Sequence, residues 1–371
     1  MADSSSASLS PVIVTGGCGF VGFHLVSGLL ASEPGCEIHV IDVNTSHNRV
    51  AGVTYYDCDI TARAEVEAVF ARARPRTVFS LASPKSTDQD DEAFRRICKG
   101  GVRNVLRAAM ATETAQAFVY TSSSSIIHDN RTDLVDADES FPVLQYPAQK
   151  LIYSLSKAEA EAEVLASNRR AGDASLLTVS IRPVTVFGAR DMMFMGTIIA
   201  NARAGKGHIQ MGPGHNIFSF TYVSNLVDAH ILAARALVAA YGRPPPPQAM
   251  RVDGDSFIIT NDEDRPFWEF QRAISASVGF KFRPEDITVI PTWACMIYAT
   301  MSEWWTWIYT WGKGKSAFSR FNVRLATHHR TLKCDKAKRV LGYRPKVGLD
   351  EGLEIASKWF LAQPQAGKKT V

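Results

Sequence analysis

A glycine-rich stretch near the amino terminus constrains the fold more than any other part of the chain. A β-branched run at 12–14 predicts a buried strand, and apolar residues at helical spacing over 21–30 predict a helix after it. Gly16, Gly19 and Gly22 stand between them, a spacing that allows a tight turn, close approach of a pyrophosphate and close packing of helix on strand. The stretch therefore predicts a dinucleotide-binding turn, with Phe20 and Val21 opening the helix whose N-terminus faces the phosphates.

An acidic residue at the end of the next predicted strand agrees with this interpretation. The apolar run 38–42 ends in Asp42, about 20 residues after Gly22, where a dinucleotide fold carries the carboxylate that binds a ribose hydroxyl. That carboxylate would repel a 2′-phosphate, so NAD is the expected cofactor, while Arg49 nearby keeps NADP open. A solvated acid at a strand end is the alternative interpretation of Asp42.

Strand and helix patterns alternate along the first half of the chain. Further strands are predicted at 53–57, 77–82, 117–121 and 176–181, and helices at 62–74, 91–110 and 153–170. Such alternation requires crossover connections and a parallel sheet with helices on both faces. The sequence thus predicts the α/β class, a doubly wound Rossmann sheet with a smaller C-terminal substrate lobe.

Length and charge set the domain plan and exclude some partners. We expect a loose tail at 1–10, a dinucleotide-binding domain at 11–188, and a substrate-binding lobe at 189–371 that returns some elements to the core; 371 residues suffice for both domains. The formal charge of +4 is spread along the chain, which argues against a nucleic-acid partner. The six cysteines lack metal-ligand spacing, so no metal site is expected.

Ligands of open α/β sheets bind beyond the carboxyl ends of the strands, so the residues that follow each strand are candidate cofactor contacts. Asp59 and Ile60 follow the third predicted strand, where a carboxylate could accept from an adenine amino group. Ala82 and Ser83 follow the fourth, where small residues leave room for the cofactor. Each of these can equally be an ordinary loop residue.

The candidate catalytic residues follow the fifth strand. Four serines, 122–125, leave that strand, and Tyr153 and Lys157 come four residues apart on the next helix, so they share one face. A phenol titrates near 10, and we expect the ammonium of Lys157 and an oxidised nicotinamide to lower that pKa enough for Tyr153 to act as a base. Lys157 can also hold the nicotinamide ribose, and Ser123 can orient the substrate oxygen. Strand alternation alone does not choose among the four serines.

These residues resemble those of the extended short-chain dehydrogenase/reductases, and more closely their 3β-hydroxysteroid dehydrogenase branch. The matching segments are 15–22, Asp42, 59–60, 120–123, 153–157 and 181–188. In that family the second serine after the threonine is catalytic, which selects Ser123. The resemblance also implies that the turn from Pro183 to Val186 lies near the nicotinamide.

Four segments of the C-terminal half, 218–225, 257–262, 266–270 and 336–345, look like the decarboxylating sterol-4α-carboxylate 3-dehydrogenases. The resemblance implies oxidation of the 3β-hydroxyl of a 4α-carboxysterol, after which the β-keto acid loses carbon dioxide. It also implies sterol biosynthesis at the cytoplasmic face of the endoplasmic reticulum, with a homodimer and association with other C4-demethylation enzymes as further expectations. A dehydrogenase of non-carboxylated 3β-hydroxysteroids or terpenoids, and a non-catalytic dinucleotide-sensing scaffold, stay open as alternatives.

Cations in the C-terminal half are candidates to bind the substrate carboxylate. They are Arg190, Arg203 and Lys206, each with a solvated surface position as its alternative. His128 departs from the family pattern, in which small or acidic residues are common at that place.

A tryptophan-rich segment at 287–311 holds five of the seven tryptophans. Pro291 and Glu303 interrupt it, so it is a poor transmembrane span. Clustered tryptophan suits the bilayer interface, and the segment is interpreted as a monotopic anchor that opens the pocket toward lipid. A buried lobe or dimer helix is the alternative.

Overall fold

The main sheet is parallel and has seven strands. The structure, a computed structural model, describes residues 8–84, 90–312 and 314–363. The strand order is β12-β7-β5-β4-β1-β2-β3, which confirms the predicted doubly wound α/β class. The bounds are β1 (Val12–Thr15), β2 (Ile38–Asp42), β3 (Thr54–Asp57), β4 (Thr77–Ser80), β5 (Ala117–Thr121), β7 (Leu177–Pro183) and β12 (Ser256–Ile259).

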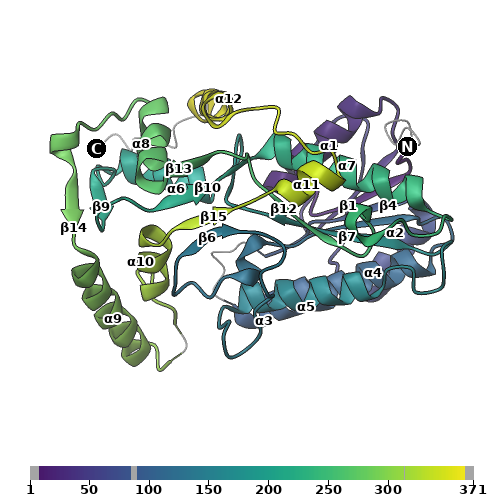
Figure 1. Cartoon of the computed structure of the whole chain (residues 1–371), viewed down its shortest axis with the longest axis horizontal. Helices are drawn as coiled ribbons and strands as arrows, with labels where there is room; N and C mark the ends of the chain where they lie inside the picture. The colour runs from purple at the N-terminus through teal and green to yellow at the C-terminus, as the bar shows by residue number, and fades with distance from the viewer. Residues whose placement is uncertain (1–7, 85–89, 313, 364–371) are drawn as a thin grey trace.

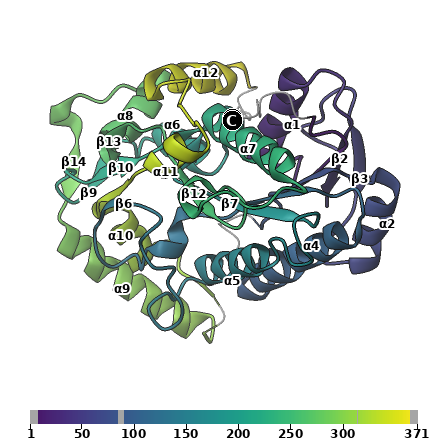
Figure 2. The same cartoon turned by 45° about the vertical axis from the view of Figure 1, so that its right-hand side comes forward.

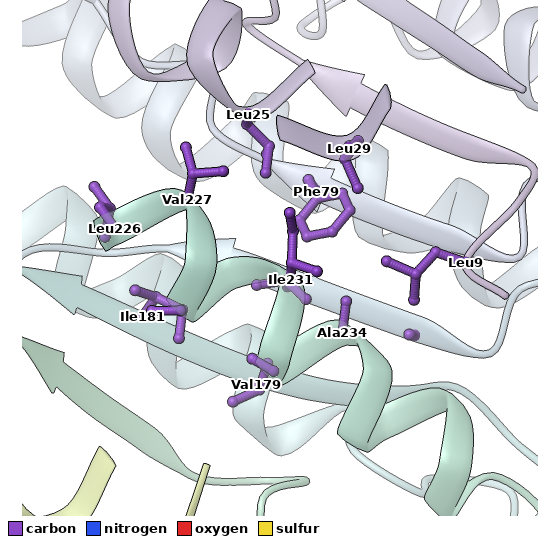
Figure 3. Close-up of a cluster of buried hydrophobic side chains, with 14 of the residues drawn as sticks. Leu9, Leu25, Leu29, Phe79, Val179, Ile181, Leu226, Val227, Ile231 and Ala234 are labelled. Atoms are coloured by element: carbon purple, nitrogen blue, oxygen red, sulfur yellow. The ribbon is translucent and has the colours of Figure 1, made fainter. Parts of the chain in front are cut away.

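Helices cover both faces of this sheet, as Figures 1 and 2 show. On one face lie α1 (Phe20–Ser32) and α7 (Val223–Ala240), on the other α2 (Arg63–Ala73), α4 (Val102–Ala111) and α5 (Ile152–Ala166). Figure 3 shows the first interface, where Leu25 and Leu29 of α1 and Ile231 of α7 pack over the strands. Both layers are closed and apolar, so the polar site must lie at the strand ends.

The helix predicted at 91–110 is not uniform. It consists of α3 (Asp91–Phe94), a π-helical segment η2 (Arg95–Gly101) and α4. The wider turn brings this helix against α5, and the Phe94 ring lies edge-on to Tyr153 with 5.8 Å between ring centroids. π-helical turns often occur beside functional sites.

A second, four-stranded sheet supports the lobe, in the order β13-β10-β15-β6. It contains β6 (Leu134–Ala137), β10 (Ile217–Ser219), β13 (Asp264–Pro266) and β15 (Arg330–Leu332). β6 therefore leaves the first half of the chain for the lobe, while α7 and β12 return from the second half to the main sheet. Because the chain crosses between the two parts in both directions, the predicted boundary at 188 does not separate them in space.

Shorter elements complete the chain. Two parallel pairs join β8 (Val186–Phe187) to β11 (Thr221–Tyr222), and β9 (Ile209–Met211) to β14 (Thr288–Ile290). The other helices are α6 (Phe194–Arg203), α8 (Phe267–Ser277), α9 (Thr292–Tyr309), α10 (Arg320–Thr327), α11 (Asp335–Val340) and α12 (Leu349–Ala362), with 3₁₀ turns η3 (Ser124–Ile127), η4 (Gln248–Met250) and η5 (Pro284–Asp286).

The predicted tail extends too far. Leu9 is fully buried, its backbone N–H donates to the Glu33 carboxylate at 3.0 Å, and Arg76 donates to the carbonyl of Ser8. Residues 8–10 thus belong to the folded domain because an apolar side chain there fills the core. Residues 1–7 lie outside the described part.

The tryptophan-rich segment folds mainly as α9, which lies at the far end of the lobe from the amino terminus (Figure 1). Of its residues only Cys295 and Ala299 are buried. Among the described helices, α7 alone has the length and hydropathy of a membrane span, and more than half of it is buried in the core.

Candidate active site

The glycine turn leaves no room for side chains. Gly16 has φ +72°, and a Cβ there would lie 2.8 Å from the Cα of Ala82. A Cβ on Gly22 would lie 2.1 Å from the carbonyl oxygen of Gly16. Gly19 is the N-cap of α1 and gives it no side-chain cap, so the first N–H groups of the helix keep no side-chain acceptor. This is the geometry that a dinucleotide pyrophosphate fits.

The residues predicted around this turn take different positions. The Asp42 carboxylate accepts from the backbone N–H of Cys18 at 3.0 Å, which fixes it beside the turn. The side chain of Phe20 packs toward the lobe and that of Val21 toward the core of the main sheet. A cofactor at the turn would therefore meet the backbone of these two residues. The nearby Arg49 lies over the Tyr55 ring, 4.4 Å from its centroid.

Of the other residues predicted to contact the cofactor at strand ends, one is buried in the core and three are partly or fully exposed. Ile60 is buried against Gly101, so its side chain serves packing, while the half-buried Asp59 accepts from the N–H of Thr61. Ala82 abuts Gly16, and the exposed Ser83 places its hydroxyl 3.5 Å from the Cys98 sulfur. Asp59, Ala82 and Ser83 thus stand at the carboxyl edge where a cofactor would run.

Three polar side chains follow one another at four-residue spacing on the inner face of α5. Tyr153 is the first, and Lys157 donates to the carbonyl oxygen of Thr121 at 2.9 Å. Glu161 accepts from Arg182 at 2.5 Å and from Ser180 at 2.7 Å. Since Arg182 and Ser180 lie on β7, this buried pair locks α5 to the strand beside the site.

The structure separates the four serines. The Ser123 side chain interacts with the Tyr153 phenol and lowers its pKa, it lines a cavity, and its hydroxyl donates to Ser125 at 2.9 Å. The Ser122 hydroxyl is buried without a hydrogen-bond partner. Ser125 also accepts from Ser154, and Ser124 lines the cavity without a contact to the phenol. Ser123 is the serine that links phenol and cavity.

The protonation of the pair differs from the sequence expectation. Burial raises the pKa of Tyr153 to about 12, and the hydrogen bond with Ser123 offsets this only in part. Burial likewise lowers the pKa of Lys157. Without cofactor the Tyr153 pKa is thus raised because desolvation is its largest cause, and the lowering expected beside a bound nicotinamide stays a prediction.

A cavity of about 140 Å³ opens beside Ser123. Its walls come from both halves of the chain and are Ser123, Ser124, Ser125, His128, Leu134, Pro183, Val184, Thr185, Arg330 and Leu332. Pro183 thus borders this cavity. Val186 instead pairs with Thr221 and packs between the core of the main sheet and the core of the lobe. The volume is below the roughly 300–1,000 Å³ of small-molecule sites, so it suits one polar end of a larger ligand.

Sequence reasoning did not single out Arg330, because it lies far along the chain in a short strand with no motif. The cations that it did single out lie elsewhere. Arg190 donates to Asn48 at 2.5 Å and stacks over Phe23, near the glycine turn, and Arg203 and Lys206 are exposed. None of the three lines the cavity described here.

The sequence matches one family model across most of its length. That model, described as the 3-beta hydroxysteroid dehydrogenase/isomerase family, matches residues 13–289. The match includes the glycine turn and the Tyr153–Lys157 pair.

Curated relatives span nearly the whole chain. It is 32% identical over 348 residues to the decarboxylating sterol-4-alpha-carboxylate 3-dehydrogenase of Schizosaccharomyces pombe, covering 93% of this chain and 96% of that one. It is 30% identical over 348 residues to the Homo sapiens protein of that name, covering 94% and 87%. It is 33% identical over 357 residues to 3beta-hydroxysteroid-dehydrogenase/decarboxylase isoform 1 of Arabidopsis thaliana, covering 92% and 77%.

Solved structures share the fold at lower identity. A UDP-glucose 4-epimerase of Thermotoga maritima with UDP-glucose superposes with a TM-score of 0.69 at 20% identity, covering 94% of this chain and 98% of that one. A dTDP-glucose 4,6-dehydratase of Bacillus anthracis in complex with NAD gives 0.67 at 18% identity, covering 94% and 96%.

Proposed function

Because the chain belongs to the 3-beta hydroxysteroid dehydrogenase/isomerase family, we propose that it oxidises the 3β-hydroxyl of a 4α-carboxysterol to the ketone, with accompanying loss of the C4 carboxyl group. The observation that carries the proposal is that Ser123, whose side chain lowers the pKa of Tyr153, also lines a cavity of about 140 Å³. The names of the relatives, which cover nine-tenths of this chain, support the carboxysterol as substrate.

The residues divide the work of the oxidation. Ser123 holds the substrate oxygen, and the Tyr153 phenolate takes the hydroxyl proton. Bound NAD⁺ supplies the hydride acceptor and a positive charge that favours the phenolate. Lys157 reaches the strand end at Thr121, where it can bind the nicotinamide ribose and orient the helix. The glycine turn and Asp42 hold the rest of the dinucleotide.

Decarboxylation follows from the product of this step. A ketone at C3 makes the C4 carboxylate that of a β-keto acid. When the C4–carboxyl bond breaks, its electron pair passes to the ketone oxygen and carbon dioxide leaves. The enolate then takes a proton at C4. Hydrogen bonds to the oxygen at C3 stabilise this charge, so the residues that serve the oxidation also serve the second step.

A substrate panel tests the proposal. Purified protein with NAD is given a 4α-carboxy-3β-hydroxysterol and the matching sterol without the carboxyl group, and NADH and carbon dioxide are measured. NADH together with carbon dioxide from the first substrate is expected. Turnover of the second alone supports a 3β-hydroxysteroid or terpenoid dehydrogenase instead. NAD binding with no turnover of either supports a dinucleotide-sensing scaffold.

We further propose that α9 docks the enzyme on the cytoplasmic face of the endoplasmic reticulum membrane. Nine of its large apolar side chains, from Trp293 to Tyr309, are 54 to 79% exposed, and a soluble surface rarely groups so many. The cations beyond it are engaged, Arg320 with Glu303 and Lys315 with Asp91, and Lys313 lies outside the described residues. The apolar face rather than charge therefore supports docking at the interface.

Vesicle binding tests the docking. Replacing Trp304, Trp305 and Trp307 with serine should abolish cosedimentation with phospholipid vesicles, while turnover of a soluble 3β-hydroxysteroid stays unchanged. The matched control replaces Ile355 and Leu361 with serine; both are exposed on α12, on another side of the lobe (Figure 1), and binding should persist. Equal binding by all proteins would contradict docking through α9. The homodimer and the association with other C4-demethylation enzymes stay predictions, which crosslinking on membranes would test.

A further inference from the structure

The cavity beside Ser123 has an arginine in its wall for which the described residues supply no ion pair. Arg330 opens β15, between β10 and β6, and its guanidinium lies 5.9 Å from the centroid of the Phe218 ring. Its Nε is buried without a hydrogen-bond partner. Among the described residues, no carboxylate forms an ion pair with it. The group is positioned by the sheet but left without a counterion.

The surroundings keep this arginine charged and uncompensated. Burial lowers its pKa to about 10, which leaves it protonated at neutral pH. The nearest acid is Asp129, whose carboxylate is engaged by the backbone N–H groups of Arg131 and Thr132. His128 donates through Nε2 to the Thr132 carbonyl at 2.8 Å and has its pKa lowered to about 4, so it is neutral. None of the ten residues that line the cavity is acidic.

Arg182 differs from Arg330 because a carboxylate pairs with it. The side chain of Arg182, 5% exposed, holds Glu161 through two nitrogens. Burying a cation without a partner costs several kcal/mol, so an unpaired one at a cavity wall points to an anion that arrives with the ligand. The anion must reach a cavity that Ser123 also lines.

We infer that Arg330 binds the carboxylate on C4 of the substrate and thereby selects carboxylated sterols. The inference rests on the proposed function and adds the group that would recognise its substrate. C3 and C4 are adjacent carbons, so a residue that binds the C4 carboxylate must lie next to the one that holds the C3 oxygen. Arg330 and Ser123 meet this requirement because they line one cavity of about 140 Å³. The planar guanidinium can donate to both carboxylate oxygens.

If Arg330 binds the C4 carboxylate, it contributes to substrate binding and not to breaking the bond between C4 and the carboxyl group. A carboxylate held by arginine is stabilised in the ground state, whereas the charge in the decarboxylation step moves to the oxygen at C3. Arg330 therefore favours substrate binding and not the later step. Since the ketone product has lost the carboxylate, it also loses this contact, which favours release.

The test compares KM and kcat for two substrates in Arg330→Gln and Arg330→Lys. For the 4α-carboxy-3β-hydroxysterol, Arg330→Gln should raise KM about 100-fold with kcat within about threefold, since a charged two-point contact is lost. Arg330→Lys, which keeps the charge but not the planar fork, should raise KM about tenfold. For the sterol without the carboxyl group both variants should match the wild type. Arg203→Gln on the exposed surface of α6 is the control and should change neither substrate.

The outcomes distinguish the two proposals. If the wild type oxidises the carboxysterol but Arg330→Gln raises KM equally for both substrates, or for neither, the assignment of Arg330 is wrong and the proposed function stands. If the wild type does not oxidise the carboxysterol at all, the proposed function fails and takes the assignment with it. Melting temperature and NAD affinity confirm that each variant is folded. If Arg330→Gln does not fold, Arg330→Lys decides by whether its KM change is confined to the carboxylated substrate.

Discussion

Arginines of the Rossmann half and Arg330 of the C-terminal lobe differ in whether a carboxylate pairs with them. In the Rossmann half, Arg182 pairs with Glu161, and Asp253 accepts from Arg169 at 2.6 Å. Across the cavity, Arg330 of the lobe has no such partner. The lobe also exposes the apolar face of α9, whereas the apolar faces of α1 and α7 are closed against the sheet (Figure 3).

This difference indicates which half is complete by itself. The Rossmann half pairs the guanidinium groups of Arg182 and Arg169 with buried carboxylates and presents preformed backbone donors to a cofactor. The lobe has an unpaired cation at its inner end and unpaired apolar surface at its outer end. We propose that an anionic apolar ligand completes the first of these sites and a lipid surface the second. Five predictions can break or sharpen this contrast.

The largest effect is expected at the preformed catalytic group. Tyr153→Phe removes the proton acceptor, and turnover should fall about a thousandfold, within the range of general-base catalysis. NAD affinity should change little, because the glycine turn is untouched. Tyr146→Phe is the control, since Tyr146 is 75% exposed and should turn over normally. Normal turnover by Tyr153→Phe would remove the proposed base.

The buried ion pair should dominate the stability of the Rossmann half. Glu161→Gln leaves Arg182 buried without its counterion, and the free energy of unfolding should fall by about 3–5 kcal/mol. The matched control is Glu67→Gln, which breaks an exposed pair with Arg63 and should cost at most about 1 kcal/mol. Urea unfolding measures both. Equal losses would mean that internal pairing does not distinguish this half.

Ser123 joins the two halves and should set the pH dependence. Its hydrogen bond lowers the pKa of Tyr153, so Ser123→Ala raises that pKa and leaves less phenolate at any lower pH. The rise of kcat/KM with pH should move to higher pH, with a loss of about 10- to 100-fold at neutral pH. Ser122→Ala is the control, because the buried hydroxyl of Ser122 contacts neither phenol nor ligand cavity. Superimposed profiles for wild type and Ser123→Ala would contradict the assignment.

Replacing Asp42 should change the preference between NAD and NADP and leave the substrate-binding lobe unchanged. Asp42→Asn removes the charge that repels a 2′-phosphate, and the preference for NAD over NADP should fall about tenfold. The control is Asp57→Asn, its neighbour on β3, whose carboxylate accepts from Thr45. Dissociation constants for both cofactors provide the measurement. A preference unchanged by Asp42→Asn but altered by Asp57→Asn would assign the ribose contact to β3.

The smallest change in stability is expected at Arg330, the arginine without a carboxylate partner. Arg330→Met removes an unpaired buried charge and keeps its apolar stem, so the free energy of unfolding should stay within about 1 kcal/mol or rise. Urea unfolding beside Glu161→Gln gives the comparison directly. A loss as large as that of Glu161→Gln would show that Arg330 serves the fold of the lobe.

Local pattern predicted the Rossmann half well. The strand ending at Asp42 follows from a short apolar run, and the helix carrying Tyr153 and Lys157 follows from the helical spacing of its residues. The π-helical turn at 95–101 has no such signature. The buried Leu9 was missed because a polar stretch around one leucine gives no periodic signal.

The sequence by itself determined the fold class, the glycine turn and the pair on α5, because each depends on residues close together along the chain. Tertiary structure alone decided which serine faces Tyr153, that burial raises the pKa of that phenol, and that Arg330 lies beside Ser123 in place of Arg190, Arg203 or Lys206. The placement of Arg330 depends on contacts across some 200 residues, made when β6 and β15 pair in one sheet. Desolvation and pairing are properties of the enclosed space, which no local pattern encodes.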